Sequence, residues 1–156
     1  MTKDVLLCIQ GLQFEEDARN DEELDKIETI CTGEYYIRNG AHYILYEEVI
    51  DGFDEPVKNI IKIRGKEFSI TKRGGYQVQM VFAEGKKTMT DYVTPFGNIL
   101  IGLDTSKIEM IEEENSLQIH IDYALEANYQ YIADCHIMIK ADSKDNNEKG
   151  KQIREF

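Results

Sequence analysis

Two histidines and an aspartate have the side-chain types and spacing that could bind a metal ion or transfer a proton. His120 and Asp122 are two residues apart in an alternating segment, so their side chains point to the same face of an extended strand. His136 lies in the next alternating segment and could join them, because imidazole and carboxylate groups serve as zinc ligands and proton carriers. All three lie opposite the apolar face, where ordinary surface residues also belong. We therefore interpret them as surface residues and predict no metal site.

A second candidate is the arginine at the end of a short alternating segment. Arg73 lies on the opposite face from Phe68 and Ile70. If its face is the inside of a closed sheet, the guanidinium needs a carboxylate partner, for which Glu47 or Glu48 is the candidate. A structural ion pair or an exposed arginine is the preferred interpretation. The functional alternative is an anchor for the anionic group of a ligand, since small-ligand sites place a few polar groups among apolar walls.

Tyrosines are the remaining candidates for contact with a ligand. Their rings supply a large contact area with a polar tip, and most of them are expected to pack across neighbouring strands. Tyr46, Tyr92 and Tyr123 join Arg73 and Glu47 as the predicted ligand-binding residues.

Sequence motifs for catalysis or for cofactor binding are absent from the chain. It contains no nucleophile elbow, no Walker loop, no dinucleotide glycine fingerprint and no Cys-x-x-Cys pair. Gly74 and Gly75 stand at a strand end without the following helix that a phosphate-binding loop requires, so a turn explains them. We predict a protein that is not an enzyme and that needs no cofactor.

The elements that position these residues are strands, because apolar and polar residues alternate with a period of two until about residue 141. In the clearest segment, Leu117, Ile119 and Ile121 share one face, as in a strand with one buried and one wet side. Asn39-Gly40 is the strongest signal for a tight hairpin turn. The fold class predicted is all-β, a closed antiparallel barrel of about 8–10 strands with at most one short helix, near residues 16–24.

Length and composition fit one domain, which we place at residues 1–141. The chain has 156 residues, of which 42% are apolar, enough to bury one core. Residues 142–156 are polar and are predicted to form a disordered tail. The three cysteines, Cys8, Cys31 and Cys135, are odd in number and lie in strand-like segments, which favours buried free thiols in a reducing compartment. The predicted location is the cytoplasm.

The charge of the chain restricts its partners. The net charge of −12 disfavours nucleic acid, because phosphate binding depends on lysine and arginine. No apolar run approaches the roughly 20 residues that a membrane helix needs, so no membrane partner is expected. Acidic residues gather at 14–28 and basic residues at 57–87. We interpret both as solvated faces and protected strand edges; the alternative is an anion-facing surface on one side of the molecule.

Five short motifs follow one another along the chain in a characteristic order. They are Thr32–Tyr36, Tyr43–Glu48, Ile70–Gly74, Tyr92–Gly97 and Ile119–Tyr123. Their order and spacing over about residues 3–141 resemble the YwiB-like family, small bacterial proteins of unknown function. The resemblance implies a calycin-like (lipocalin-like) barrel whose interior is filled or holds one small ligand. It brings no catalytic residue to carry over.

Two functional hypotheses follow from these features. The first is a cytoplasmic, non-enzymatic barrel that binds a small, partly apolar or anionic ligand. A barrel solidly filled by Phe68, Met80, Phe82 and Ile101 would argue against it. The second is a protein-interaction or structural module that acts through its charged outer face or as a homodimer. An enzyme ranks third, with no reaction class that the residues indicate.

Overall fold

The chain folds into a closed barrel of antiparallel strands, as predicted. A computed structural model describes residues 3–11, 28–49, 52, 54–74, 77–94 and 97–144. These residues form ten strands: β1 (Lys3–Gln10), β2 (Glu28–Arg38), β3 (Ala41–Glu48), β4 (Val57–Arg64), β5 (Glu67–Arg73), β6 (Gln77–Ala83), β7 (Lys86–Thr94), β8 (Gly97–Glu113), β9 (Ser116–Ala127) and β10 (Gln130–Ser143). Each strand pairs with the next along the chain, and β1 pairs with β10 to close the barrel.

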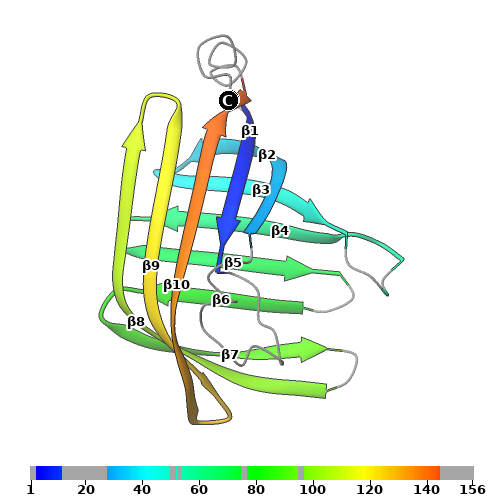
Figure 1. The fold of residues 1–156 in the computed structure, drawn as a ribbon, viewed down its shortest axis with the longest axis vertical. Coiled ribbons are helices and arrows are strands. Elements are labelled where there is room, and N and C mark those ends of the chain that lie inside the picture. Colours follow the sequence, from blue (N-terminus) through cyan, green and yellow to red (C-terminus); the bar gives the residue numbers. More distant parts are fainter. Residues whose placement is uncertain are drawn as a thin grey trace.

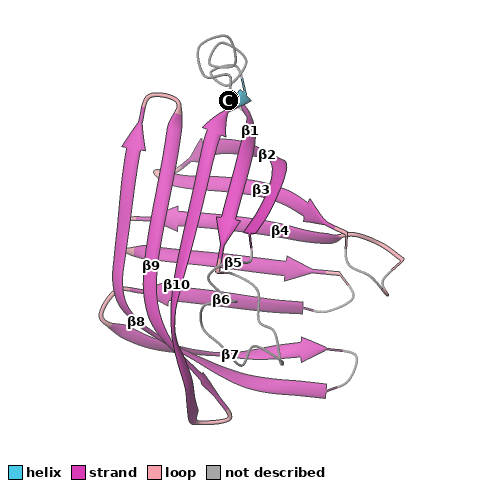
Figure 2. Ribbon diagram, viewed as in Figure 1, coloured by secondary structure: helices cyan, strands magenta, loops and turns pink. Residues whose placement is uncertain are grey.

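The barrel is flattened into two layers whose strands cross. In Figure 1, β1, β8, β9 and β10 run along the long axis of the view, whereas β3 to β7 run across it. Figure 2 shows that strands make up nearly all of the described chain. The start of β1, the turn between β8 and β9 and the end of β10 lie together at the upper end of the view (Figure 1). We call this end the mouth of the barrel.

The turn between β2 and β3 is built as the sequence predicts. Asn39 and Gly40 both have a positive φ, 51° and 78° respectively. Two successive positive φ angles are typical of the tight turn that suits the twist of a hairpin. The turn sets the register of β2 against β3, with Arg38 opposite Ala41 and Ile37 opposite His42.

Strand β8 is long and irregular. It is one strand of 17 residues, interrupted by a register shift between Thr105 and Lys107 in its pairing with β9. An extra residue in one strand of a pair exchanges the faces of the residues that follow it. Leu103 precedes the shift and Ile108 follows it. Both are therefore buried, although one has an odd and the other an even position in the strand.

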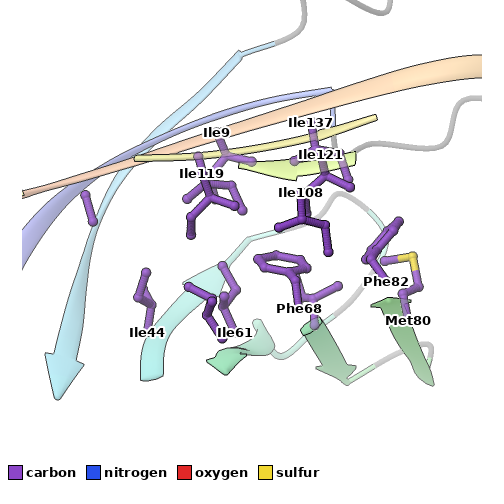
Figure 3. Close-up of a cluster of buried hydrophobic side chains, with 14 of the residues drawn as sticks. Ile9, Ile44, Ile61, Phe68, Met80, Phe82, Ile108, Ile119, Ile121 and Ile137 are labelled. Carbon is purple, nitrogen blue, oxygen red and sulfur yellow. The ribbon is translucent and has the colours of Figure 1, made fainter. Parts of the chain in front are cut away.

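The middle of the barrel is filled by large apolar side chains from both layers. Phe68, Met80 and Phe82 are 0% exposed and Ile101 is 5% exposed. The Phe82 ring lies edge-on to Tyr123, with 4.9 Å between ring centroids. Figure 3 shows isoleucines from the two layers meeting this cluster. Burying each such side chain contributes about 1.5–3 kcal/mol to stability, so the core holds the layers together.

Some expectations fall outside the described residues. The short helix near residues 16–24 and most of the polar tail belong to segments that the structure does not describe. Strand β10 ends at Ser143, so the barrel extends past the boundary predicted at residue 141. Within the described part of the chain, no helix is long and apolar enough to cross a membrane.

Candidate functional site

A cavity of about 320 Å³ opens at the mouth of the barrel. Its walls come from the start of β1, the end of β2, the β8–β9 turn and the end of β10. The lining residues with apolar side chains are Val5, Ile37, Leu117 and Ala141, and those with polar side chains are Lys3, Tyr35, Glu112, Glu113, Glu114, Asn115, Ser116 and Ser143. An apolar floor with a polar rim is the usual build of a small-molecule site.

Strand register explains why Tyr35 and Glu112 face the cavity. Tyr35 lies opposite Ile44 of β3, which is fully buried in the core. Glu112 lies opposite Leu117 of β9, which is 5% exposed. Residues directly opposite each other in an antiparallel pair point to the same face of the sheet. Both polar side chains therefore point inward, at the level where the apolar core ends.

An imidazole connects these two residues. Tyr35 Oη lies 2.6 Å from His42 Nδ1, and His42 Nε2 lies 3.8 Å from Glu112 Oε1. The His42 side chain is only 12% exposed, whereas that of Glu112 is 53% exposed. Burial, and then the negative charge of Glu112, raise the pKa of Tyr35 above its ordinary value of 10. The phenol is thus held neutral and acts as a hydrogen-bonding group rather than as a base at neutral pH.

The structure corrects the hypothesis of an inward-facing arginine. Arg73 is exposed at the end of β5, and it is the neighbouring Lys72 that is buried. Lys72 Nζ lies 2.7 Å from Glu48 Oε1, which also accepts a 2.9 Å hydrogen bond from Asn59 Nδ2. Burial and the charge of Glu48 raise the pKa of the nearby Cys31 thiol. The inward ion pair expected near the end of β5 exists, but Lys72 supplies the cation.

The other predicted ligand residues do not gather at one place. Glu47 is exposed, in register with Lys58 of β4. Tyr46 and Tyr123 are 5% and 3% exposed and belong to the core. Tyr92 is half-buried and packs against that core. None of the five predicted ligand residues is among those that line the cavity at the mouth. Their binding role stays a prediction.

The histidine–aspartate group does come together, on the outer face of β9 and β10. His136 Nδ1 lies 2.6 Å from Asp122 Oδ1, and His136 Nε2 lies 3.1 Å from His120 Nδ1. The side chains of His136 and Asp122 are 45% and 49% exposed. These three side chains form a hydrogen-bonded group at the surface of the barrel. In the ranges that the structure describes, no group of three or more His, Cys, Asp or Glu residues is arranged to hold a metal ion.

Sequence reasoning missed the site at the mouth, although part of its signal was present. The two-residue turn at Asn39-Gly40 fixes the hairpin register, which places His42 opposite Ile37 and near Tyr35. Glu112 could not be found in the same way. It comes from a distant strand, and the register shift in β8 changes which of its residues face inward.

Comparison with known proteins supports the fold and adds no ligand. The uncharacterized β-barrel protein YwiB of Bacillus subtilis (strain 168) is 28% identical over 104 residues, 67% of this chain and 72% of that protein. A crystal structure of the ywiB protein superposes with a TM-score of 0.73 at 22% identity, covering 91% of this chain and 92% of the other. The family described as a domain of unknown function, DUF1934, matches residues 12–139. The chain belongs to the DUF1934 family.

Proposed function

We propose that this protein is a non-enzymatic binding module that takes up a small, partly apolar molecule at the mouth of its barrel. The observation that carries the proposal is the cavity of about 320 Å³, with Val5, Leu117 and Ala141 in its floor and Tyr35 and Glu112 among its polar walls. This volume is near the lower end of the usual range for ligand sites, which is about 300–1,000 Å³.

The filled middle of the barrel favours binding at the mouth over binding at the centre. Phe68, Met80, Phe82 and Ile101 occupy the central space, which argues against a ligand enclosed there. A ligand at the mouth needs no rearrangement of this core. It would cover the apolar surface of Ile37, which lines the cavity and is 54% exposed, and such burial is the main driving force for binding partly apolar molecules.

A binding role suits the neutral Tyr35 better than a catalytic one. A general base works best with a pKa near the working pH, whereas the pKa of Tyr35 is raised above 10. We place the protein in the cytoplasm, because Cys8 and Cys31 are free thiols, as expected in a reducing compartment.

Native mass spectrometry of the full chain, purified from its own cells, tests the proposal. The wild-type protein should carry a small molecule that the Ala141→Phe variant has lost, because a phenyl ring at this lining position fills the floor. Lys140→Phe is the matched control, since the adjacent Lys140 side chain is 43% exposed and does not line the cavity. A wild type that carries no small molecule, or an Ala141→Phe variant that still carries it, would contradict the proposal.

Self-association is the second candidate function, and exposed apolar groups at the β9–β10 turn favour it. Tyr129 and Ile132 are three residues apart in the chain and are 78% and 54% exposed, which is high for large apolar side chains. We propose that a second copy of the chain covers them. Sedimentation equilibrium at increasing concentration should then detect a dimer that the Ile132→Asp variant does not form. A wild type that stays monomeric at high concentration would exclude this candidate.

A further inference from the structure

The polar walls of the mouth are dominated by hydrogen-bond acceptors that carry negative charge. Glu112, Glu113 and Glu114 follow one another where β8 turns into β9, and all three line the cavity. Among the described residues that line the cavity, Lys3 is the single base. Three carboxylates against one ammonium leave the cavity with an excess of negative charge. A ligand with a carboxylate or phosphate would meet repulsion here, whereas a cation would meet attraction.

The hydroxyl of Tyr35 independently points to a ligand that donates hydrogen bonds. With the imidazole proton of His42 on Nε2, which lies 3.8 Å from the Glu112 carboxylate, Nδ1 accepts the hydrogen bond from the Tyr35 hydroxyl at 2.6 Å. The Tyr35 proton is then already engaged. The phenolic oxygen retains a lone pair, and Tyr35 lines the cavity. An N–H donor of a ligand can use that lone pair, while an acceptor cannot.

The floor sets the rest of the ligand's chemistry. Val5, Leu117 and Ala141 are 3–5% exposed, and they meet the cavity with aliphatic surface. Contact with this surface favours an apolar group of modest size, because the cavity volume is about 320 Å³. The charged wall and the aliphatic floor together favour a molecule that joins a positively charged group, which donates hydrogen bonds, to a short apolar group.

We infer that the ligand of the mouth is a small amphipathic organic cation, whose ammonium group binds between Glu112 and the Tyr35 oxygen while its apolar part covers the floor. This inference rests on the proposed function and makes its ligand class specific. It also replaces the anionic ligand expected from the sequence, because that expectation depended on an inward-facing Arg73, and Arg73 is exposed.

Three probes of nearly equal size and different charge test the inference on the full chain. Hexylammonium, 1-hexanol and hexanoate are titrated at low ionic strength and pH 7, and binding is followed by ligand-observed NMR. Hexylammonium should bind about three- to fivefold more tightly than 1-hexanol, because part of the carboxylate wall is open to water, and hexanoate should bind most weakly. Raising the salt concentration should weaken binding of hexylammonium and leave that of 1-hexanol unchanged.

A matched pair of variants locates the effect. Glu112→Gln keeps the size of the side chain and removes its charge. The affinity for hexylammonium relative to that for 1-hexanol should therefore fall by about three- to fivefold. Glu109→Gln removes the same charge from the same strand, but Glu109 does not line the cavity. It should leave the affinities for all three probes unchanged.

The outcomes separate this inference from the function on which it rests. If 1-hexanol or hexanoate binds as tightly as hexylammonium, the cationic class is wrong while the binding site at the mouth survives. Equal losses in Glu112→Gln and Glu109→Gln would also overturn the inference, because the net charge of the protein rather than the mouth would then be responsible. If none of the three probes binds, and Ala141→Phe retains whatever the wild type carries, the proposed function fails as well.

Discussion

Lys72 and Arg73 are adjacent in β5, yet water reaches only one of them freely. The Lys72 side chain is 7% exposed and its partner Glu48 is 15% exposed, with 2.7 Å between Nζ and Oε1. Removing two charges from water costs free energy that their attraction offsets only partly, so such a pair adds little net stability. Removing one partner is different, because the remaining charge then stays buried without compensation.

The variant Lys72→Met should therefore be costly. We expect the free energy of unfolding, measured with urea, to fall by about 3 kcal/mol because the Glu48 carboxylate is left buried and unpaired. Arg73→Met is the control and should change it by less than about 0.5 kcal/mol, as for most exposed positions. Adding Glu48→Gln to Lys72→Met should recover most of the loss, since the neutral amide still offers an oxygen to Asn59. Equal effects of Lys72→Met and Arg73→Met would show that Lys72 is not a buried cation.

The pH dependence of stability should report on Tyr123, which is 3% exposed. Burial raises the pKa of its phenol well above the usual 10. The folded protein therefore keeps this proton at a pH where the unfolded chain has lost it. Tyr123 contributes full stability below about pH 10, and the contribution is lost as the pH rises further, by up to about 1.4 kcal/mol per pH unit.

Urea unfolding of wild type and Tyr123→Phe between pH 8 and 11 measures this contribution. The variant should lose stability less steeply above pH 10 than the wild type does. Tyr129→Phe is the control, because Tyr129 is 78% exposed, and its slope should match that of the wild type. Parallel curves for wild type and Tyr123→Phe would mean that Tyr123 ionises in the folded protein as easily as in the unfolded chain.

Part of this residue-scale picture could be predicted from the sequence. Lys72 lies two residues after Ile70 and four after Phe68, so all three side chains point to the same face of the strand. The alternation that buries Phe68 and Ile70 therefore also buries Lys72. The same alternation points Arg73 outward, which agrees with the exposed arginine of the preferred interpretation and not with the inward-facing alternative. The sequence also narrows the carboxylate partner to Glu47 or Glu48, and Glu48 is the one that contacts Lys72.

Among the elements, the β2–β3 hairpin is the part of the site that local sequence determines best. Asn39 and Gly40 set the turn, the turn sets the register, and the register brings His42 beside Tyr35. Strand β8 shows the opposite case. The polar stretch from Thr105 to Lys107 resembles a break between strands in the sequence, but it is a bulge within one strand. A bulge preserves the strand and changes which residues face inward, and the alternation pattern alone does not separate it from a loop.

Gly40 is the position at which this hairpin can be tested. Its φ is +78°, and a Cβ there would meet no atom within 4 Å, so the backbone conformation rather than space decides the effect of a substitution. Gly40→Val should lower the free energy of unfolding by about 2 kcal/mol, because a β-branched residue resists a positive φ. Gly40→Asn should cost much less, since asparagine tolerates this conformation. Urea unfolding that finds the two variants equally stable would contradict the turn described here.

At the scale of the whole molecule, the first and last strands of the barrel lie side by side. Val5, Leu6 and Leu7 of β1 lie opposite Ser143, Asp142 and Ala141 of β10. This pairing closes the barrel and also builds one wall of the mouth. The pairing continues to Ser143, two residues beyond the predicted boundary at residue 141.

Two truncated chains test whether the last residues of β10 contribute to the stability of the barrel. A chain that ends at Lys144 should keep the melting temperature of the full protein, because the polar composition of the remaining residues predicts no share in a core. A chain that ends at Lys140 should melt several degrees lower, since it loses the buried Ala141 and Ser143 together with their pairing to β1. Similar melting temperatures for the two truncated chains would show that the end of β10 adds nothing to the fold.

The pairing of β1 with β10 also has a consequence for synthesis of the protein in the cell. Of the ten described strands, β1 is made first, and its partner on one side, β10, is made last. Until then one edge of β1 has exposed backbone donors and acceptors that another chain could pair with. Closure between strands so distant in sequence also implies slow folding. The charges of Lys3 and Asp4 at the start of β1 thus lie where a nascent chain most needs protection from aggregation.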